Sequence, residues 1–192
     1  MRNCLDHLCI IVKSVNAVKE FFNNRGVKTE EIKIKEEAKE FYVDNNKGIA
    51  GIRFVELKEG NVYKGFPLED VYGIHHFGLA VTNIKEFLKN IEDVAWYLHP
   101  MSISTYESSK RVWLSKEGAP FLLEIIEDPL KCSNFSEKEG FVNEIFFPES
   151  NFDNALINSL ETKELKVANL SEWRIRVEDN FFTIEDFYDE IN

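Results

Sequence analysis

Two histidine–glutamate pairs, one in each half of the chain, are the residues of this sequence best suited to chemistry. His7 precedes Glu56 by 49 residues, and His76 precedes Glu124 by 48 residues. Each glutamate lies in a short apolar segment, as does each histidine. Two imidazoles and two carboxylates together can hold a metal ion. The spacing therefore predicts a duplicated unit and one divalent metal site built from both copies.

The residues around the two histidines also repeat. Leu5–Val12 reads LDHLCIIV, and Ile74–Val81 reads IHHFGLAV. When the apolar positions of the two segments are kept in phase, His7 aligns with His76. Because consecutive side chains of a strand point to opposite faces, only one of His75 and His76 can face a site. We therefore expect His76 to be a ligand and His75 to be a surface residue or to lie behind the ligands.

The donor types indicate what such a site would do. An ionised carboxylate inside an apolar strand costs several kcal/mol unless it is paired or bound to a metal, which favours a metal role for Glu124. For Glu56, an ion pair with Arg53 or Lys58 is an alternative. The four donors suit Zn, Ni, Co, Fe or Mn and leave positions for water or substrate. The ion would polarise a carbonyl group and stabilise an enediolate or enolate, with Glu124 or Glu56 moving the proton.

Periodicity in the first half predicts the elements that would position His7 and Glu56. An apolar, β-branched strand at 5–12 is followed by a helix that begins near Ser14 or Asn16 and ends at Gly26. Strands are expected at 31–35, which alternates and should be half buried, at 40–43 and at 49–57. The predicted order is βαβββ.

The second half repeats this order. A strand at 74–81 precedes a helix that begins after Thr82-Asn83, and strands are expected near 102–107, 110–115 and 121–126. Residues 94–100 are compatible with a short strand or a packed loop. His99, within that stretch, is expected to be structural.

These patterns divide the chain into four parts: a first βαβββ module at 1–60, a linker at 61–72, a second βαβββ module at 73–128 and a C-terminal extension at 129–192. The fold class is α+β. The extension resembles an incomplete third module, in which Asn143 stands in the place of the histidine and no acid follows at the matching position. We expect it to pack against the two modules and to contribute no metal ligand.

Composition limits the partners and the compartment. The formal net charge of −11 disfavours nucleic acid and anionic membranes, which are bound by clustered Lys and Arg. Cys4, Cys9 and Cys132 are too few for a disulfide framework and suggest a reducing compartment. No apolar stretch approaches the roughly 18–20 residues of a membrane-spanning helix, so we expect a cytoplasmic protein. A homodimer is compatible with these features.

Two modules with a His in the first strand and a Glu in the last strand resemble the vicinal oxygen chelate superfamily over about residues 4–128. That superfamily includes glyoxalase I, methylmalonyl-CoA epimerase, extradiol dioxygenases and the fosfomycin and bleomycin resistance proteins. The segments 73–81 (GIHHFGLAV) and 116–124 (KEGAPFLLE) look most like those of the epimerases. The resemblance implies that each module curls into a half-barrel cup and that the first strand lies beside the last.

The resemblance leaves three function classes open. The first is a metal-dependent isomerase, epimerase or lyase acting on a small carbonyl substrate, with His7, Glu56, His76 and Glu124 as ligands. The second is a non-catalytic protein that binds a small planar molecule, as bleomycin resistance proteins do. The third is an extradiol dioxygenase, which would use two histidines and one carboxylate and leave one of the two glutamates unexplained.

Overall fold

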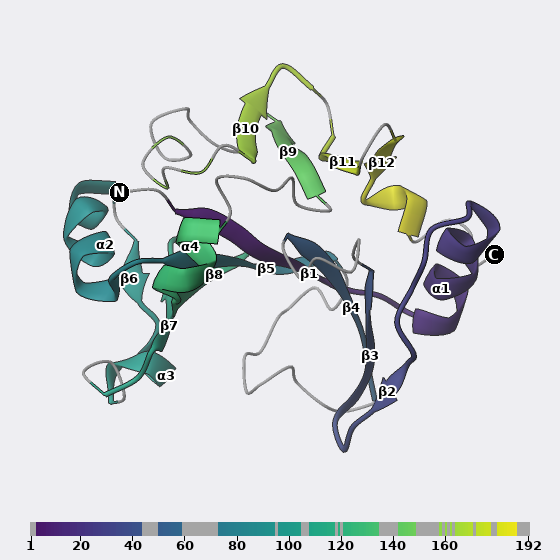
Figure 1. Ribbon diagram of the computed structural model, residues 1–192, viewed down its shortest axis with the longest axis horizontal. Helices are drawn as coiled ribbons and strands as arrows, with labels where there is room; N and C mark the ends of the chain where they lie inside the picture. Colours follow the sequence, from purple (N-terminus) through teal and green to yellow (C-terminus); the bar gives the residue numbers. More distant parts are fainter. Residues whose placement is uncertain are drawn as a thin grey trace.

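The computed structural model places two βαβββ modules side by side in one eight-stranded sheet (Figure 1). The strand order is β2-β3-β4-β1-β5-β8-β7-β6, so each module supplies four adjacent strands. This confirms the α+β class and the pairing of two modules. The structure describes residues 3–43, 50–58, 73–94, 96–104, 108–117, 119, 121–134, 142–148, 158, 160, 162, 164–170, 172–177 and 180–187.

The first module contains β1 (Cys4–Ile11), α1 (Val15–Asn24), β2 (Lys33–Ile34), β3 (Ala38–Val43) and β4 (Gly51–Leu57). α1 begins after Ser14, whose side-chain oxygen accepts a hydrogen bond from the Ala17 amide at 3.3 Å. The strand expected at 31–35 is present as β2, but it is shorter, with two paired residues, and it is not half buried, since Ile34 is 75% exposed.

The second module contains β5 (Gly73–Val81), α2 (Ile84–Asn90), the 3-10 helix η1 (Glu92–Val94), β6 (Tyr97–Leu98), α3 (Pro100–Ile103), β7 (Arg111–Ser115) and β8 (Leu122–Glu127). The strand expected near 102–107 is wrong where the structure describes it, since 102 and 103 belong to α3. His99 caps that helix by accepting a hydrogen bond from the Met101 amide at 3.3 Å, and Pro100 supplies a helical φ angle at its first position. His99 is therefore structural, as expected. Residues 105–107 lie outside the described residues.

The two modules meet where β1 and β5 pair antiparallel, while each first strand runs parallel to the last strand of its own module. Across this seam His7 pairs with Gly78, and Cys9 pairs with His76. Because exchanging the two modules turns each of these pairs into the other, the seam has an approximate twofold axis. The register slips once on each side of the axis, so that Asp6 is the extra residue of β1 and His75 is the extra residue of β5.

The extension begins with α4 (Pro129–Asn134) and then forms a separate four-stranded sheet, whose order is β10-β9-β11-β12. Its elements are β9 (Val142–Pro148), β10 (Leu165–Ala168), β11 (Arg174–Val177), β12 (Asn180–Thr183) and the 3-10 helix η2 (Glu185–Phe187). Here the first strand, β9, lies beside the second and third strands rather than the last, so the strand order differs from that of the two modules. Residues 150–160, whose apolar periodicity predicts a helix, lie almost wholly outside the described residues.

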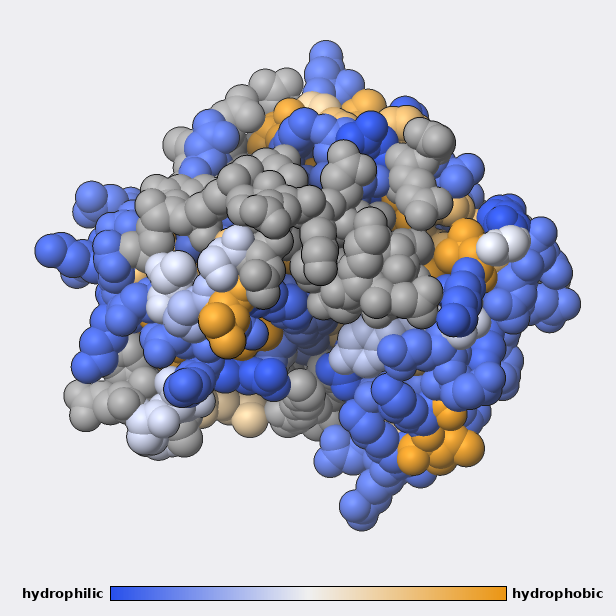
Figure 2. Space-filling view, in the orientation of Figure 1, coloured by the Kyte–Doolittle hydropathy of each residue, from blue (hydrophilic) through white to orange (hydrophobic). Residues whose placement is uncertain are grey.

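The second sheet covers one face of the large sheet (Figure 1), and aromatic residues fill the space between the two sheets. Ring centroids of Phe77 and Phe147 are 5.5 Å apart, and those of Phe22 and Phe182 are 5.7 Å apart. The extension therefore packs against both modules, as expected. On the face shown in Figure 2, hydrophilic side chains dominate and hydrophobic ones form separate small areas. Within the described part of the chain, no helix has the length and apolar character needed to cross a membrane.

Candidate metal centre

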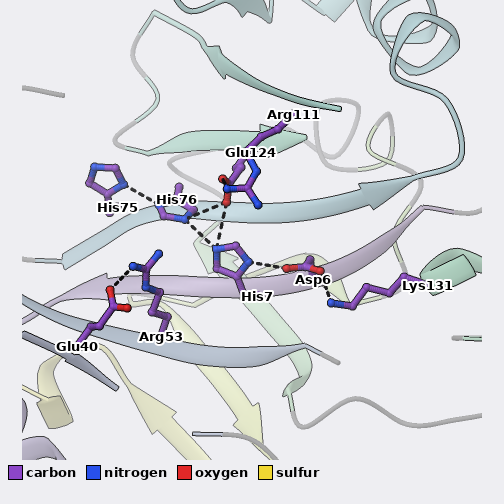
Figure 3. A network of polar contacts seen from close by, with 9 residues as sticks. All are labelled: Asp6, His7, Glu40, Arg53, His75, His76, Arg111, Glu124 and Lys131. Carbon is purple, nitrogen blue, oxygen red and sulfur yellow. Dashed lines mark hydrogen bonds and ion pairs between the residues drawn. The ribbon is translucent and has the colours of Figure 1, made fainter. Parts of the chain in front are cut away.

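Three of the four residues proposed as ligands meet on the face of the large sheet that the second sheet leaves uncovered. His7, His76 and Glu124 are all buried, and one donor atom of each lies within 4.8 Å of the others (Figure 3). The Nε2 atoms of the two histidines are 2.9 Å apart. Glu124 Oε2 lies 3.3 Å from Nε2 of His7 and 3.6 Å from Nε2 of His76.

These distances suit a single small divalent ion. Donors at about 2.1 Å from one ion are separated by about 3.0 Å on a face of an octahedron and by about 3.4 Å in a tetrahedron. The three observed separations, 2.9, 3.3 and 3.6 Å, fall around these values. Two imidazoles and one carboxylate also form a recognised ligand set that leaves coordination positions open. Residues and geometry therefore both fit a divalent ion.

The strand register explains how the three side chains meet. His7 on β1 and Glu124 on β8 both pair with Gly78 on β5, one from each side. A Cβ atom at Gly78 would lie 2.4 Å from Nδ1 of His7 and 2.5 Å from its Cε1, which no real structure tolerates. The His7 ring can therefore lie over β5 only because residue 78 is a glycine.

Asp6 holds the outer nitrogen of His7. The Nδ1 atom of His7 lies 2.7 Å from Asp6 Oδ2, and Lys131 forms an ion pair with the other Asp6 oxygen. Burial raises the pKa of Asp6, but the hydrogen bond with His7 and the ion pair with Lys131 outweigh this effect and hold the pKa below its ordinary value. A hydrogen bond from Nδ1–H to this carboxylate leaves Nε2 of His7 with its lone pair toward the centre.

His75 has the corresponding role for His76. Nδ1 of His75 lies 2.7 Å from Nδ1 of His76, so the outer nitrogen of the second ligand is also engaged. The ring of Trp113 packs edge-on against His76, with centroids 4.8 Å apart. His75 is 1% exposed, so the expectation that it could be a surface residue is wrong, whereas a place behind the ligands is correct. The bulge in β5 allows both histidines to lie inside.

Glu56 is not brought to this cluster. Its Oε2 atom accepts a hydrogen bond from the Val15 amide at 3.0 Å, and its Oε1 atom lies 2.6 Å from Lys39 Nζ. Glu127 has the same place in the second module, where it accepts a hydrogen bond from the Ile84 amide at 3.1 Å. Glu56 is thus the counterpart of Glu127 at a helix N-terminus, and its expected place beside the other three donors is wrong.

The true counterpart of Glu124 is Arg53. Glu124 pairs with Gly78, and Arg53 pairs with Cys9, the residue that the approximate twofold axis exchanges with Gly78. Both Glu56 and Glu127 follow these positions by three residues. An alignment that matches Glu56 with Glu127 also matches Arg53 with Glu124, and it can be made from the sequence alone.

A cleft of about 290 Å³ opens beside the cluster. His7 and Glu124 reach its wall, and Arg111 lies 3.1 Å from the second carboxylate oxygen of Glu124. The sequence did not single out Asp6, Arg53, Arg111 or Lys131 for the site, yet all four line this cleft. The other lining residues are Glu30, Lys33, Tyr42, Gly51 and Ile126.

No protein-family model matches the sequence, and no curated protein matches it either. Among solved structures, a hypothetical protein from Bacillus halodurans is 19% identical, with a TM-score of 0.49, and the match covers 67% of this chain and 96% of that one. A Streptomyces coelicolor methylmalonyl-CoA epimerase is 16% identical, with a TM-score of 0.44, over 66% and 97% of the two chains. A catechol 2,3-dioxygenase is 12% identical, with a TM-score of 0.38, over 64% and 40%. Each of these matches covers about two thirds of this chain.

Proposed function

We propose that this protein is a metal-dependent enzyme in which His7, His76 and Glu124 hold one divalent ion beside the cleft. The observation that carries the proposal is the triangle of three buried donor atoms with edges of 2.9, 3.3 and 3.6 Å. An ion in that place would polarise a carbonyl or hydroxyl oxygen of a small substrate and offset the charge of an enolate or a similar anion.

The surrounding residues support this assignment by fixing the donors. Asp6 and His75 engage the outer nitrogens of the two histidines, which directs both Nε2 atoms toward Glu124. Arg111 lies against Glu124 Oε1, so Oε2 faces the histidines. Such outer partners orient ligands and commonly change metal affinity 10- to 100-fold, by about 1.4 to 2.7 kcal/mol. The cleft then gives a substrate access to the open side of the ion.

Two reaction classes fit a small substrate bound through oxygen. A ligand set of two histidines and one carboxylate is typical of non-haem iron oxygenases, and the position of Glu56 at a helix end leaves no glutamate unexplained. This favours a dioxygenase-type reaction. The isomerase, epimerase or lyase expected from the sequence would need a general base, and Glu124, which is tied to Arg111 and the histidines, is its candidate.

Non-catalytic binding of a planar molecule is less well supported. A binder has no need of three converging metal donors with their outer partners in place. The cleft wall is also mainly charged, with Tyr42 as its one aromatic residue among those that the structure describes. The cytoplasmic location and the homodimer stay predictions.

Metal titration tests the proposal. Chelator-treated protein should take up one Co, Fe, Ni, Zn or Mn ion per chain, and His7→Ala, His76→Ala and Glu124→Gln should each lower the affinity at least tenfold. Glu56→Gln is the matched control and should bind the ion as the unaltered protein does. Absence of specific uptake, or an equal loss with Glu56→Gln, would refute the three-ligand centre.

A second measurement separates the reaction classes. Iron-loaded protein should consume oxygen in the presence of catechol-type substrates if it is a dioxygenase. Exchange of a substrate proton for deuterium without oxygen uptake would instead indicate the isomerase or epimerase class. Stoichiometric binding with neither reaction across these substrates would indicate a binding protein.

A further inference from the structure

The first module carries a cation at the position where the second module carries its carboxylate donor. Arg53 and Glu124 are related by the approximate twofold axis, because their strand partners Cys9 and Gly78 exchange with one another. Both side chains line the same cleft. This position therefore carries no fourth donor, and a positive charge faces the same space.

Arg53 is held firmly in place. It is 6% exposed and forms an ion pair with Glu40 (Figure 3). Its guanidinium lies 5.6 Å from the centre of the Tyr42 ring. The second oxygen of Glu40 lies 2.5 Å from Lys35. Lys35 and Arg53 thus share this carboxylate, which sets one negative charge against their two positive charges.

The cleft as a whole has the same sign. Among the residues that the structure describes, Arg53, Arg111, Lys33 and Lys131 line it together with three carboxylates, although the chain as a whole carries a formal net charge of −11. Among the described residues, Glu124 would be the one anionic ligand of a divalent ion, so the loaded centre would also keep positive charge. A substrate that brings a negative charge would complete this arrangement.

We propose that Arg53 selects an anionic substrate, a small carboxylate whose charged group lies toward Arg53 while a neighbouring oxygen reaches the ion. This inference rests on the proposed metal centre. A guanidinium presents paired donors that match a carboxylate, and its hydrogen bonds to an ion are about twice as strong as those between neutral groups.

Glycolate and glycolamide test the selection, since they have the same shape and differ in charge. The cobalt-loaded protein, followed through its visible spectrum, should bind glycolate at least about tenfold more tightly than glycolamide. Arg53→Gln combined with Glu40→Gln removes the pair without leaving one partner buried alone and should abolish the preference, whereas Arg53→Lys should retain part of it. Lys89→Gln, at an exposed position of α2 outside the cleft, is the control and should change the preference less than threefold. An unchanged preference in the double variant would overturn the proposal.

The twofold relation gives a second, opposite test. Arg53→Glu combined with Glu40→Gln should supply a fourth ligand, which is a second carboxylate, raise cobalt affinity about tenfold and remove the preference for glycolate. A merely structural Arg53 would give a loss of stability without a gain in cobalt affinity.

If the unaltered protein bound no cobalt, the proposed function would fail. The anion site would then be judged by sulfate binding to the metal-free protein, where equal binding by the Arg53→Gln/Glu40→Gln variant would overturn it.

Discussion

Asp6 and His75 occupy equivalent bulges on the two sides of the seam between the modules, and each contacts the outer nitrogen of the histidine that follows it. Asp6 lies 2.7 Å from Nδ1 of His7, and His75 lies 2.7 Å from Nδ1 of His76. In a regular strand these side chains would point away from the site. The extra residue in each strand turns these side chains inward, so both outer contacts result from the same backbone feature, a β-bulge.

Removing either outer contact should weaken metal binding while the ligands themselves remain. Asp6→Asn and His75→Phe should each lower cobalt affinity by about 10- to 100-fold, because the ligand histidine loses the partner that fixes its tautomer and ring orientation. Isothermal titration calorimetry measures the change. Asp93→Asn, at an exposed residue of η1, is the control. Affinities equal to that control would show that the bulged residues do not act on the centre.

Gly78→Ala should damage the site specifically. The added methyl group would lie 2.4 Å from Nδ1 of His7, so the ring must leave its place over β5 and metal affinity should fall at least about tenfold. Gly26→Ala makes a matched control, since Gly26 has φ +73° and open space around it. That control should cost about 1 kcal/mol of unfolding free energy with unchanged metal affinity. Denaturant unfolding and metal titration of both variants separate the two effects.

The Glu40–Arg53 pair should make stability depend on acid pH. Burial raises the pKa of Glu40, but the hydrogen bonds and charges of Arg53 and Lys35 outweigh it, so the pKa lies below its ordinary value of 4.5. A lowered folded-state pKa stabilises the fold above about pH 4.5, and this contribution is lost as the pH falls through the folded-state pKa.

Urea unfolding between pH 7 and pH 3 measures this dependence. Glu40→Gln should flatten the acid limb and cost about 3–5 kcal/mol near neutral pH, because Arg53 stays buried without its carboxylate. An acid limb as steep as that of the unaltered protein would assign the effect to other carboxylates.

Glu56 and Glu127 should act on helices rather than on the metal. Glu56→Ala and Glu127→Ala each remove a carboxylate from the N-terminus of a helix, at Val15 and Ile84. Each should cost about 1 kcal/mol of unfolding free energy. Thermal unfolding with parallel metal titration checks this. A loss of metal affinity in Glu56→Ala but not in Glu127→Ala would show that Glu56 contributes to the metal site.

Removal of the second sheet should expose an apolar face without removing a ligand. Phe147 and Trp173 pack against Phe121 and Phe77 of the second module. Truncation after Asn134 retains α4 with Lys131 and should cause dimerisation or aggregation, seen by light scattering. The remaining folded protein should still bind one ion per chain. A monomer of unchanged stability would contradict this role of the extension.

Periodicity and repetition predicted the modules, the two histidines and Glu124, because these depend on alternation within single strands. They failed for Glu56 because the segment between first and last strand is two residues shorter in the first module. The counterpart of Glu124 therefore lies 46 residues after His7, at Arg53, instead of 48. Glu56, at 49, matched the expected spacing by coincidence.

Asp6 and His75 were missed for a different reason. Strict alternation places neighbours of an inward residue outside, and a bulge is visible only once two strands are paired. Arg53 was noticed as a partner for Glu56, but its place in the cleft depends on the register between β1 and β4. Cross-strand register is a non-local property, which one sequence does not specify by itself.

An ion at this centre would join β1 and β5, the two strands of the seam between the modules. One histidine comes from each side of the seam, and 69 positions separate them along the chain. A bound ion would therefore act as a crosslink that closes a long loop, and closure restrains the unfolded chain more as the loop lengthens. Opening of the seam would require release of the ion, so the amides of β1 and β5 would exchange their hydrogens more slowly in loaded protein than in metal-free protein. The exchange rate of the amides of β2, at the distant edge of the sheet, would not change.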